Sequence, residues 1–106
     1  MAKFLFEAHY TAAGVKGVLH EGGAARRAAI AKTIEGLGGK LEAFYFAFGD
    51  VDAFVIADLP DAVSAAALAL AVSQSGAATA KTVALITPEE IDKAAKKAVA
   101  YRPPGQ

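Results

Sequence analysis

The order of the expected elements predicts an α+β fold of the split βαβ, or ferredoxin-like, type, with a four-stranded antiparallel sheet and two helices on one face. Strand-like and helix-like segments follow each other as β, broken α, β, β, α, β and a terminal helix. A glycine-containing hairpin at Gly49-Asp50 joins the second and third strands. The chain has 106 residues, which suffices for one compact domain.

Residues 3–10 are expected to form the first strand, because apolar side chains alternate along them and place on one face Phe4, Phe6, Ala8 and Tyr10. The pattern from Gly14 to Leu37 is helical, but Gly22-Gly23 interrupts it and predicts a broken helix. The second piece ends at Gly38-Gly39, and its apolar stripe is Ile30, Ile34 and Leu37.

Two aromatic and β-branched runs, 41–48 and 51–59, predict a hairpin with a type II′ turn at Gly49-Asp50. This turn pairs Phe48 with Val51. One face of the hairpin then carries Phe44, Phe46, Phe48, Val51, Ala53 and Val55. The opposite face carries Leu41, Ala43, Tyr45, Ala47, Asp52, Phe54 and Ile56. Both faces are mostly apolar.

The second half of the chain predicts a helix, a strand and a short last helix. Asp61 is placed to cap an alanine-rich helix whose expected stripe is Val63, Ala67 and Leu70, joined by Leu68 and Val72. Residues 80–87 predict the fourth strand. The sequence Thr87-Pro88-Glu89-Glu90 is a capping box that predicts a helix from 88 to about 98. We expect a single domain over residues 1–98 and an extended arm over 99–106.

Helices on one side of the sheet leave its second, apolar face without cover. A chain of 106 residues supplies no further layer, so a second copy of the chain is expected to cover this face. Two sheets packed face to face would form a dimeric α/β barrel whose interior can hold side chains or one small ligand. A trimer built through sheet edges is the competing geometry.

Residues from about 3 to 90 resemble the GYD domain family. The resemblance is carried by His9-Tyr10-Thr11 and by the segments 14–17, 38–40, 43–52 and 56–61. It implies a ferredoxin-like fold of the dimeric α/β-barrel type. The naming motif, Gly-x-Tyr-Asp, maps onto residues 49–52, where Val51 stands in the place of the tyrosine. The family has no established activity; related barrels include cofactor-free oxygenases, lactone isomerases and haem-handling enzymes, an analogy of fold alone.

Composition excludes several classes of function. Eleven basic residues balance 11 acidic ones, which argues against nucleic acid or an anionic membrane as partner. The absence of cysteine removes disulfides and thiol chemistry. His9 and His20 lie on different expected elements without metal-ligand spacing, so neither a metal nor a cofactor is expected. The charge-free stretch 62–80 contains polar residues and no export signal is visible, so we expect no membrane span and a cytoplasmic location.

Two pairs of polar residues are candidates for a site. Glu7 and His9 point the same way from the first strand, so the carboxylate could orient the imidazole for proton transfer. The alternative is a hydrogen-bonded polar patch inside an interface. Tyr45 and Asp52 share a hairpin face and could contact a ligand. Alternatively, Asp52 accepts backbone N–H groups beside the turn while Tyr45 fills an interface.

Arg26 and Arg27 follow Gly22-Gly23 at a helix start and are candidates for binding a phosphate or a carboxylate. The alternative is a solvated helix end, or an arginine paired with Glu21 or Glu35.

The leading hypothesis is a homo-oligomer that binds a small, partly apolar molecule in a sheet-lined cavity, with Tyr45, Asp52 and His9 as polar contacts. One alternative is a cofactor-independent oxygenase or isomerase in which His9, assisted by Glu7, removes a proton from the substrate. Another is a structural or partner-interaction module without a ligand.

Overall fold

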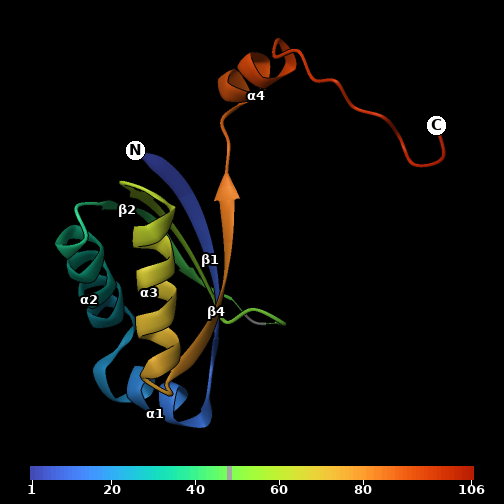
Figure 1. Cartoon of the computed structure of the whole chain (residues 1–106). Helices are drawn as coiled ribbons and strands as arrows, with labels where there is room; N and C mark the ends of the chain where they lie inside the picture. Colours follow the sequence, from blue (N-terminus) through green and yellow to red (C-terminus); the bar gives the residue numbers. More distant parts are fainter. Residues whose placement is uncertain (48) are drawn as a thin grey trace.

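The computed structural model describes residues 1–47 and 49–106. Along them the chain forms β1 (Ala2–Tyr10), α1 (Ala12–Glu21), α2 (Gly23–Gly36), β2 (Lys40–Phe46), β3 (Ala53–Leu59), α3 (Ala62–Gln74), β4 (Ala78–Leu85) and α4 (Pro88–Ala95). The strands build one antiparallel sheet in the order β2-β3-β1-β4. Helices α2 and α3 cover one face, and α1 lies at one end (Figure 1). The predicted ferredoxin-like fold is confirmed.

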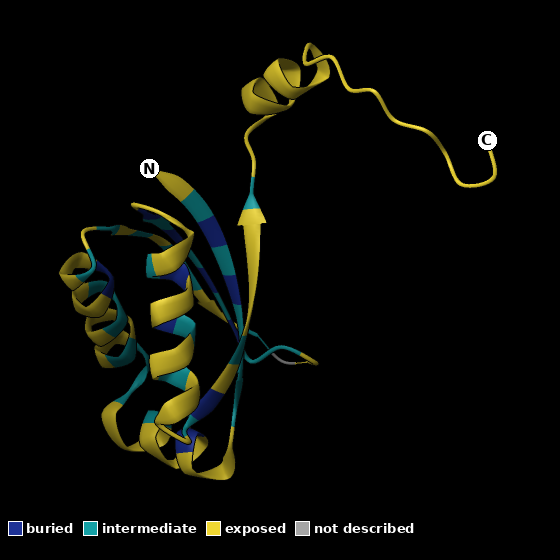
Figure 2. Ribbon diagram, viewed as in Figure 1, coloured by how far each residue is buried: buried dark blue, intermediate teal, exposed yellow. Residues whose placement is uncertain are grey.

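The hydrophobic core lies between the helices and the sheet. Successive side chains of a strand point to opposite faces, so β1 gives the core Phe4 and Phe6 but not Leu5 between them. Ile34 of α2 and Leu59 of β3 are fully buried. Burial of one such side chain stabilises the fold by about 1.5–3 kcal/mol relative to its exposure. Figure 2 shows the buried residues concentrated on the strands and on the helix faces toward them.

The hairpin has the register that the predicted turn requires. Phe44 lies opposite Val55, and Phe46 lies opposite Ala53. The predicted pairing of Phe48 lies outside the described residues. Every strand begins and ends within two residues of its prediction.

A β-bulge near Glu42 shifts the register of β2 between Leu41 and Ala43. A shift of one residue moves a side chain to the other face of the sheet. Leu41 therefore packs against the core, and its predicted place on the opposite face is wrong.

Helix α3 buries only part of the apolar surface predicted for it. Its core contacts come from Ala65 and Leu68, whereas Val63 and Leu70 are 77% and 71% exposed. Of the predicted apolar positions, Leu68 and Val72 pack in the core as expected, whereas the predicted burial of Val63, Ala67 and Leu70 is wrong. Because this helix is apolar on nearly all sides, periodicity does not single out the face that packs on the sheet.

The C-terminal region extends away from the sheet (Figure 1). The capping box of α4 is formed as predicted: the Glu90 backbone N–H donates to the Thr87 hydroxyl over 3.1 Å, and the Thr87 N–H donates to the Glu90 carboxylate over 3.0 Å. The helix ends at Ala95 rather than near Ala98. All residues from Ile86 to Gln106 are exposed. The radius of gyration, 16.7 Å, accordingly exceeds the roughly 13 Å of a compact chain of this length.

In the part of the chain that the structure describes, no helix combines the length and the apolar character needed to cross a membrane.

Helix α1 docks on the connection between α3 and β4 through a close backbone approach. Thr11 caps the helix by accepting the Gly14 N–H over 3.2 Å, and its own N–H donates to the Ala77 carbonyl over 2.9 Å. A Cβ atom added at Gly14 would lie 1.9 Å from the Ala77 carbonyl oxygen. A side chain at position 14 would therefore push α1 off this connection.

We expect Gly14→Ala to lower the free energy of unfolding by about 2 kcal/mol or more, because the clash is with backbone. Gly17→Ala is the matched control on the same helix, since nothing lies within 4 Å of its added Cβ. This control should leave stability unchanged or raise it by up to about 1 kcal/mol. Urea denaturation of the two variants measures the difference, and equal midpoints would contradict the close approach.

Candidate functional site

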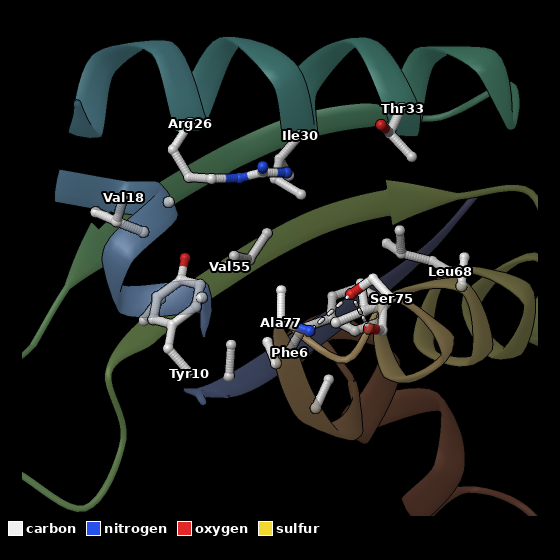
Figure 3. Close-up of a pocket in the computed structure, with 18 of the residues that line it drawn as sticks. Phe6, Tyr10, Val18, Arg26, Ile30, Thr33, Val55, Leu68, Ser75 and Ala77 are labelled. Atoms are coloured by element: carbon white, nitrogen blue, oxygen red, sulfur yellow. Dashed lines mark hydrogen bonds between the residues drawn. The ribbon is translucent and has the colours of Figure 1, made fainter. Parts of the chain in front are cut away.

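A cavity of about 370 Å³ lies between the sheet and helices α1, α2 and α3. Figure 3 shows its lining residues, which come from both layers. Most are apolar and many are small, among them Ala8, Gly17, Ala53, Ala71, Ala77 and Ala80. Protein interiors are normally close-packed, but alanine and glycine cannot fill the space between a sheet and three helices. The volume lies within the range of small-ligand pockets.

Arg26 reaches this cavity because of its position in α2. Arg26, Ile30 and Thr33 follow each other at helical spacing, so all three side chains face the sheet and line the cavity. In Figure 3 the Arg26 side chain runs below α2, and its guanidinium lies beside Ile30. Arg27, one residue further around the helix, contributes instead to a separate hollow with Phe44 and Phe46.

The bend at Gly22 brings the end of α1 to the start of α2. Gly22 has φ 91°, which other residues rarely adopt, and its N–H still bonds to the Val18 carbonyl over 2.8 Å. This geometry places the Glu21 carboxylate 3.5 Å from an Arg26 guanidinium nitrogen, as one of the sequence alternatives expected. Both side chains are about one-third exposed, so the contact adds little stability.

Tyr10 ends β1 and lines the cavity on the same face as Phe6. Its ring lies 6.5 Å from that of Phe46, and its hydroxyl points into the cavity (Figure 3). Burial raises the pKa of the Tyr10 hydroxyl above its ordinary value. The nearby Arg26 opposes this rise in pKa, whereas the negative charges of Asp52 and Glu21 add to it.

Asp52 ties β3 to the end of β1. Its carboxylate accepts the Tyr10 backbone N–H over 2.9 Å, and its backbone N–H donates to the Ala8 carbonyl over 2.9 Å. This is the backbone-binding role that the sequence offered as the alternative to ligand contact. Asp52 does not line the cavity below the helices.

Glu7, His9 and Tyr45 lie on the outer face of the sheet, away from the helices. Phe54 lies opposite Tyr45 on one side and opposite Glu7 on the other, so two strand spacings, roughly 10 Å, separate Tyr45 from Glu7. His9 lies opposite Thr79 of β4. The described residues show no hydrogen bond between Glu7 and His9. His9, Tyr45 and Asp52, the expected polar contacts of a sheet-lined cavity, do not line a common cavity among the described residues of the single chain, where Tyr45 is 71% exposed.

No group of three or more His, Asp or Glu side chains within residues 1–47 and 49–106 is arranged to hold a metal ion.

The fold and this site define a small α+β protein with a ferredoxin-like sheet and an apolar cavity below its helices. The family model for the GYD domain matches residues 4–95, so the chain belongs to the GYD domain family. Neither the curated proteins nor the solved structures that were compared give a significant match.

Sequence reasoning found Arg26 but did not select Tyr10 for the site. The signal was present, because Tyr10 is the polar end of the apolar face formed by Phe4, Phe6 and Ala8. Alternation along the strand gives the face on which Tyr10 lies. The cavity beside it depends on the position of α1, which no pattern in the sequence gives.

We expect Tyr10 to ionise at higher pH than a tyrosine in the unfolded chain. Its raised pKa stabilises the folded protein fully below pH about 10, and this contribution is lost as pH rises through the folded pKa. Arg26→Gln should raise the pKa further, since it removes the one charge that opposes the shift. The difference in ultraviolet absorbance between the protein and its Tyr10→Phe variant measures the titration. A midpoint that falls in the Arg26→Gln variant would refute the assignment.

Proposed function

We propose that this GYD domain binds a small, largely apolar molecule in the cavity between its sheet and its helices. The observation that carries the proposal is the cavity itself, about 370 Å³ lined mainly by apolar side chains. Desolvation of apolar ligand surface supplies binding free energy, about 25 cal/mol per Å². A few polar groups among apolar walls are typical of small-molecule sites. Here these groups include Tyr10 and Arg26, rather than Tyr45, Asp52 and His9.

The His9 alternative is supported less well. Proton abstraction needs a base oriented by a partner and held beside the substrate. In the described residues no hydrogen bond orients the His9 ring, and His9 does not line the cavity below the helices. A substrate of His9 would have to bind on the outer face of the sheet, where we place the contact between two copies of the chain.

We also propose that two copies of the chain associate through the outer faces of their sheets. The centre of this face is apolar, with Leu5 opposite both Ile56 and Val83. Charged residues lie toward its margins: Lys3 pairs with Glu42 and, over 3.0 Å, with Asp58, while Lys81 lies opposite Glu7. An apolar centre with a polar rim is the usual composition of a protein interface.

Binding is tested with N-phenyl-1-naphthylamine, a neutral apolar dye that fluoresces when it leaves water. We expect saturable binding that Ala71→Phe weakens at least tenfold, because the added ring occupies the cavity. Ala66→Phe is the matched control, an exposed alanine of the same helix that does not line the cavity. Saturable binding of equal strength in both variants, or none in the unmodified protein, would reject the cavity as the binding site.

Association is tested by light scattering after size exclusion. The protein should have about twice the 10.8 kDa mass of the chain. Ile56→Lys, or Val83→Lys at a more exposed position, should give monomers, because it places an unpaired charge in the apolar centre. Val63→Asp is the control on the helix side, where the residue is 77% exposed. A monomeric or trimeric native protein, or a dimer that only Val63→Asp dissociates, would contradict association through the outer faces.

A further inference from the structure

We propose that the ligand of the cavity is an amphipathic monocarboxylate, whose carboxylate binds between Arg26 and Tyr10 and whose apolar body lies along the alanines below the helices. This inference rests on the proposed binding function and adds the chemical class of the ligand. Three features of the cavity support it: the direction of the Arg26 guanidinium, the unoccupied donor of Tyr10 and the single positive charge of the lining.

The guanidinium of Arg26 faces the cavity rather than water alone. A charged group placed beside an apolar wall loses hydration, which costs free energy unless a partner compensates it. Within the described residues, its acceptor is Glu21, through one contact of 3.5 Å. A guanidinium has five N–H donors in a planar fork, so most of its capacity is left for another acceptor. A carboxylate matches this fork through two parallel hydrogen bonds.

Tyr10 supplies a second donor to the same space (Figure 3). The described residues give its hydroxyl no hydrogen-bond partner. A tyrosine hydroxyl has an ordinary pKa near 10 and is protonated at neutral pH, so that of Tyr10 can donate. A cation and a neutral donor that face one space favour a negatively charged group that accepts hydrogen bonds, and an ionised carboxylate is such a group at neutral pH.

The charge of the cavity lining favours a monoanion. Arg26 is the only basic residue among the described residues of the lining, and Glu21 places a negative charge beside it. A phosphate monoester, with a charge near −2, loses more hydration than a carboxylate on entering the cavity, and an arginine whose charge Glu21 already offsets compensates this loss less fully. The remaining walls, among them Val18, Ile30 and Val55, are apolar and fit an aliphatic or aromatic body.

The test displaces N-phenyl-1-naphthylamine from the full-length protein at pH 7 with octanoate, octanamide, octylamine and octyl phosphate, which share one chain and differ in the head group. We expect octanoate to bind about tenfold more tightly than octanamide, as a charge-assisted hydrogen bond predicts, and octylamine and octyl phosphate to bind more weakly than octanoate. Equal affinity for octanoate and octanamide, or tighter binding of octyl phosphate or octylamine, would overturn the carboxylate assignment.

Two neighbouring arginines provide a matched pair of variants. Arg26→Gln should remove the preference for octanoate while leaving the affinity for octanamide within about twofold, because it changes the head-group site alone. Arg27 lines a separate hollow, so Arg27→Gln should leave the affinities for octanoate and for octanamide unchanged. Glu21→Gln should tighten octanoate binding by severalfold, since it removes the competing carboxylate. A preference for octanoate that Arg27→Gln abolishes and Arg26→Gln retains would place the anion site in the other hollow.

The outcomes separate this inference from the proposed function. Displacement by all four molecules with equal strength supports an apolar cavity and rejects the carboxylate. Failure of the dye to bind at all rejects both. Circular dichroism of each variant before titration establishes that the fold is intact.

Discussion

One constraint organises this structure: the central strand β1 has two faces, and the helices cover only one of them. β1 pairs with β3 on one side and with β4 on the other, so its backbone hydrogen bonds are satisfied within the sheet. Alternation then sends Phe4 and Phe6 toward the helices and Leu5 and Glu7 outward. The residues that point toward the helices form the core and line the cavity. The residues that point outward belong to the face that we propose as an interface.

Small residues turn the covered face into two different environments. At the end of β3, the large side chain of Leu59 lies near Ile34, and both are fully buried. Toward the end of β1 the sheet instead carries Ala8 and Ala53, while Gly14 holds α1 against Ala77. Small side chains explain both features: the glycine at position 14 lets two backbones approach closely, and the alanines at positions 8 and 53 leave space unfilled. The Gly22 bend then sets Glu21 and Arg26 beside this volume, with Tyr10 facing it from the sheet.

The fold was predictable from the sequence because alternation, glycine breaks and capping signals each act locally. The capping box at Thr87 and the break at Gly22 illustrate this, and both are formed as expected. The errors have long-range causes. Leu41 changed faces through a bulge that only the pairing of β2 with β3 creates. The buried face of α3 depends on what packs against it, because its own sequence is apolar on most sides. Local sequence patterns do not predict the cavity for the same reason. Alanine-rich segments either pack closely or leave space, according to the distance between the sheet and the helices.

The two proposals use opposite faces of one strand, and this sets how strongly they can influence each other. Tyr10 points into the cavity, whereas Glu7 and His9 point to the face where a second copy would pack. A ligand acts on the partner copy only by moving β1, and β1 is fixed by hydrogen bonds to two neighbouring strands and by Asp52, which accepts the Tyr10 N–H. Sites that share no side-chain contacts usually contribute additively to free energies. Association and ligand binding are therefore expected to be nearly independent, so that a monomeric outer-face variant remains a suitable protein in which to measure the affinity of the cavity.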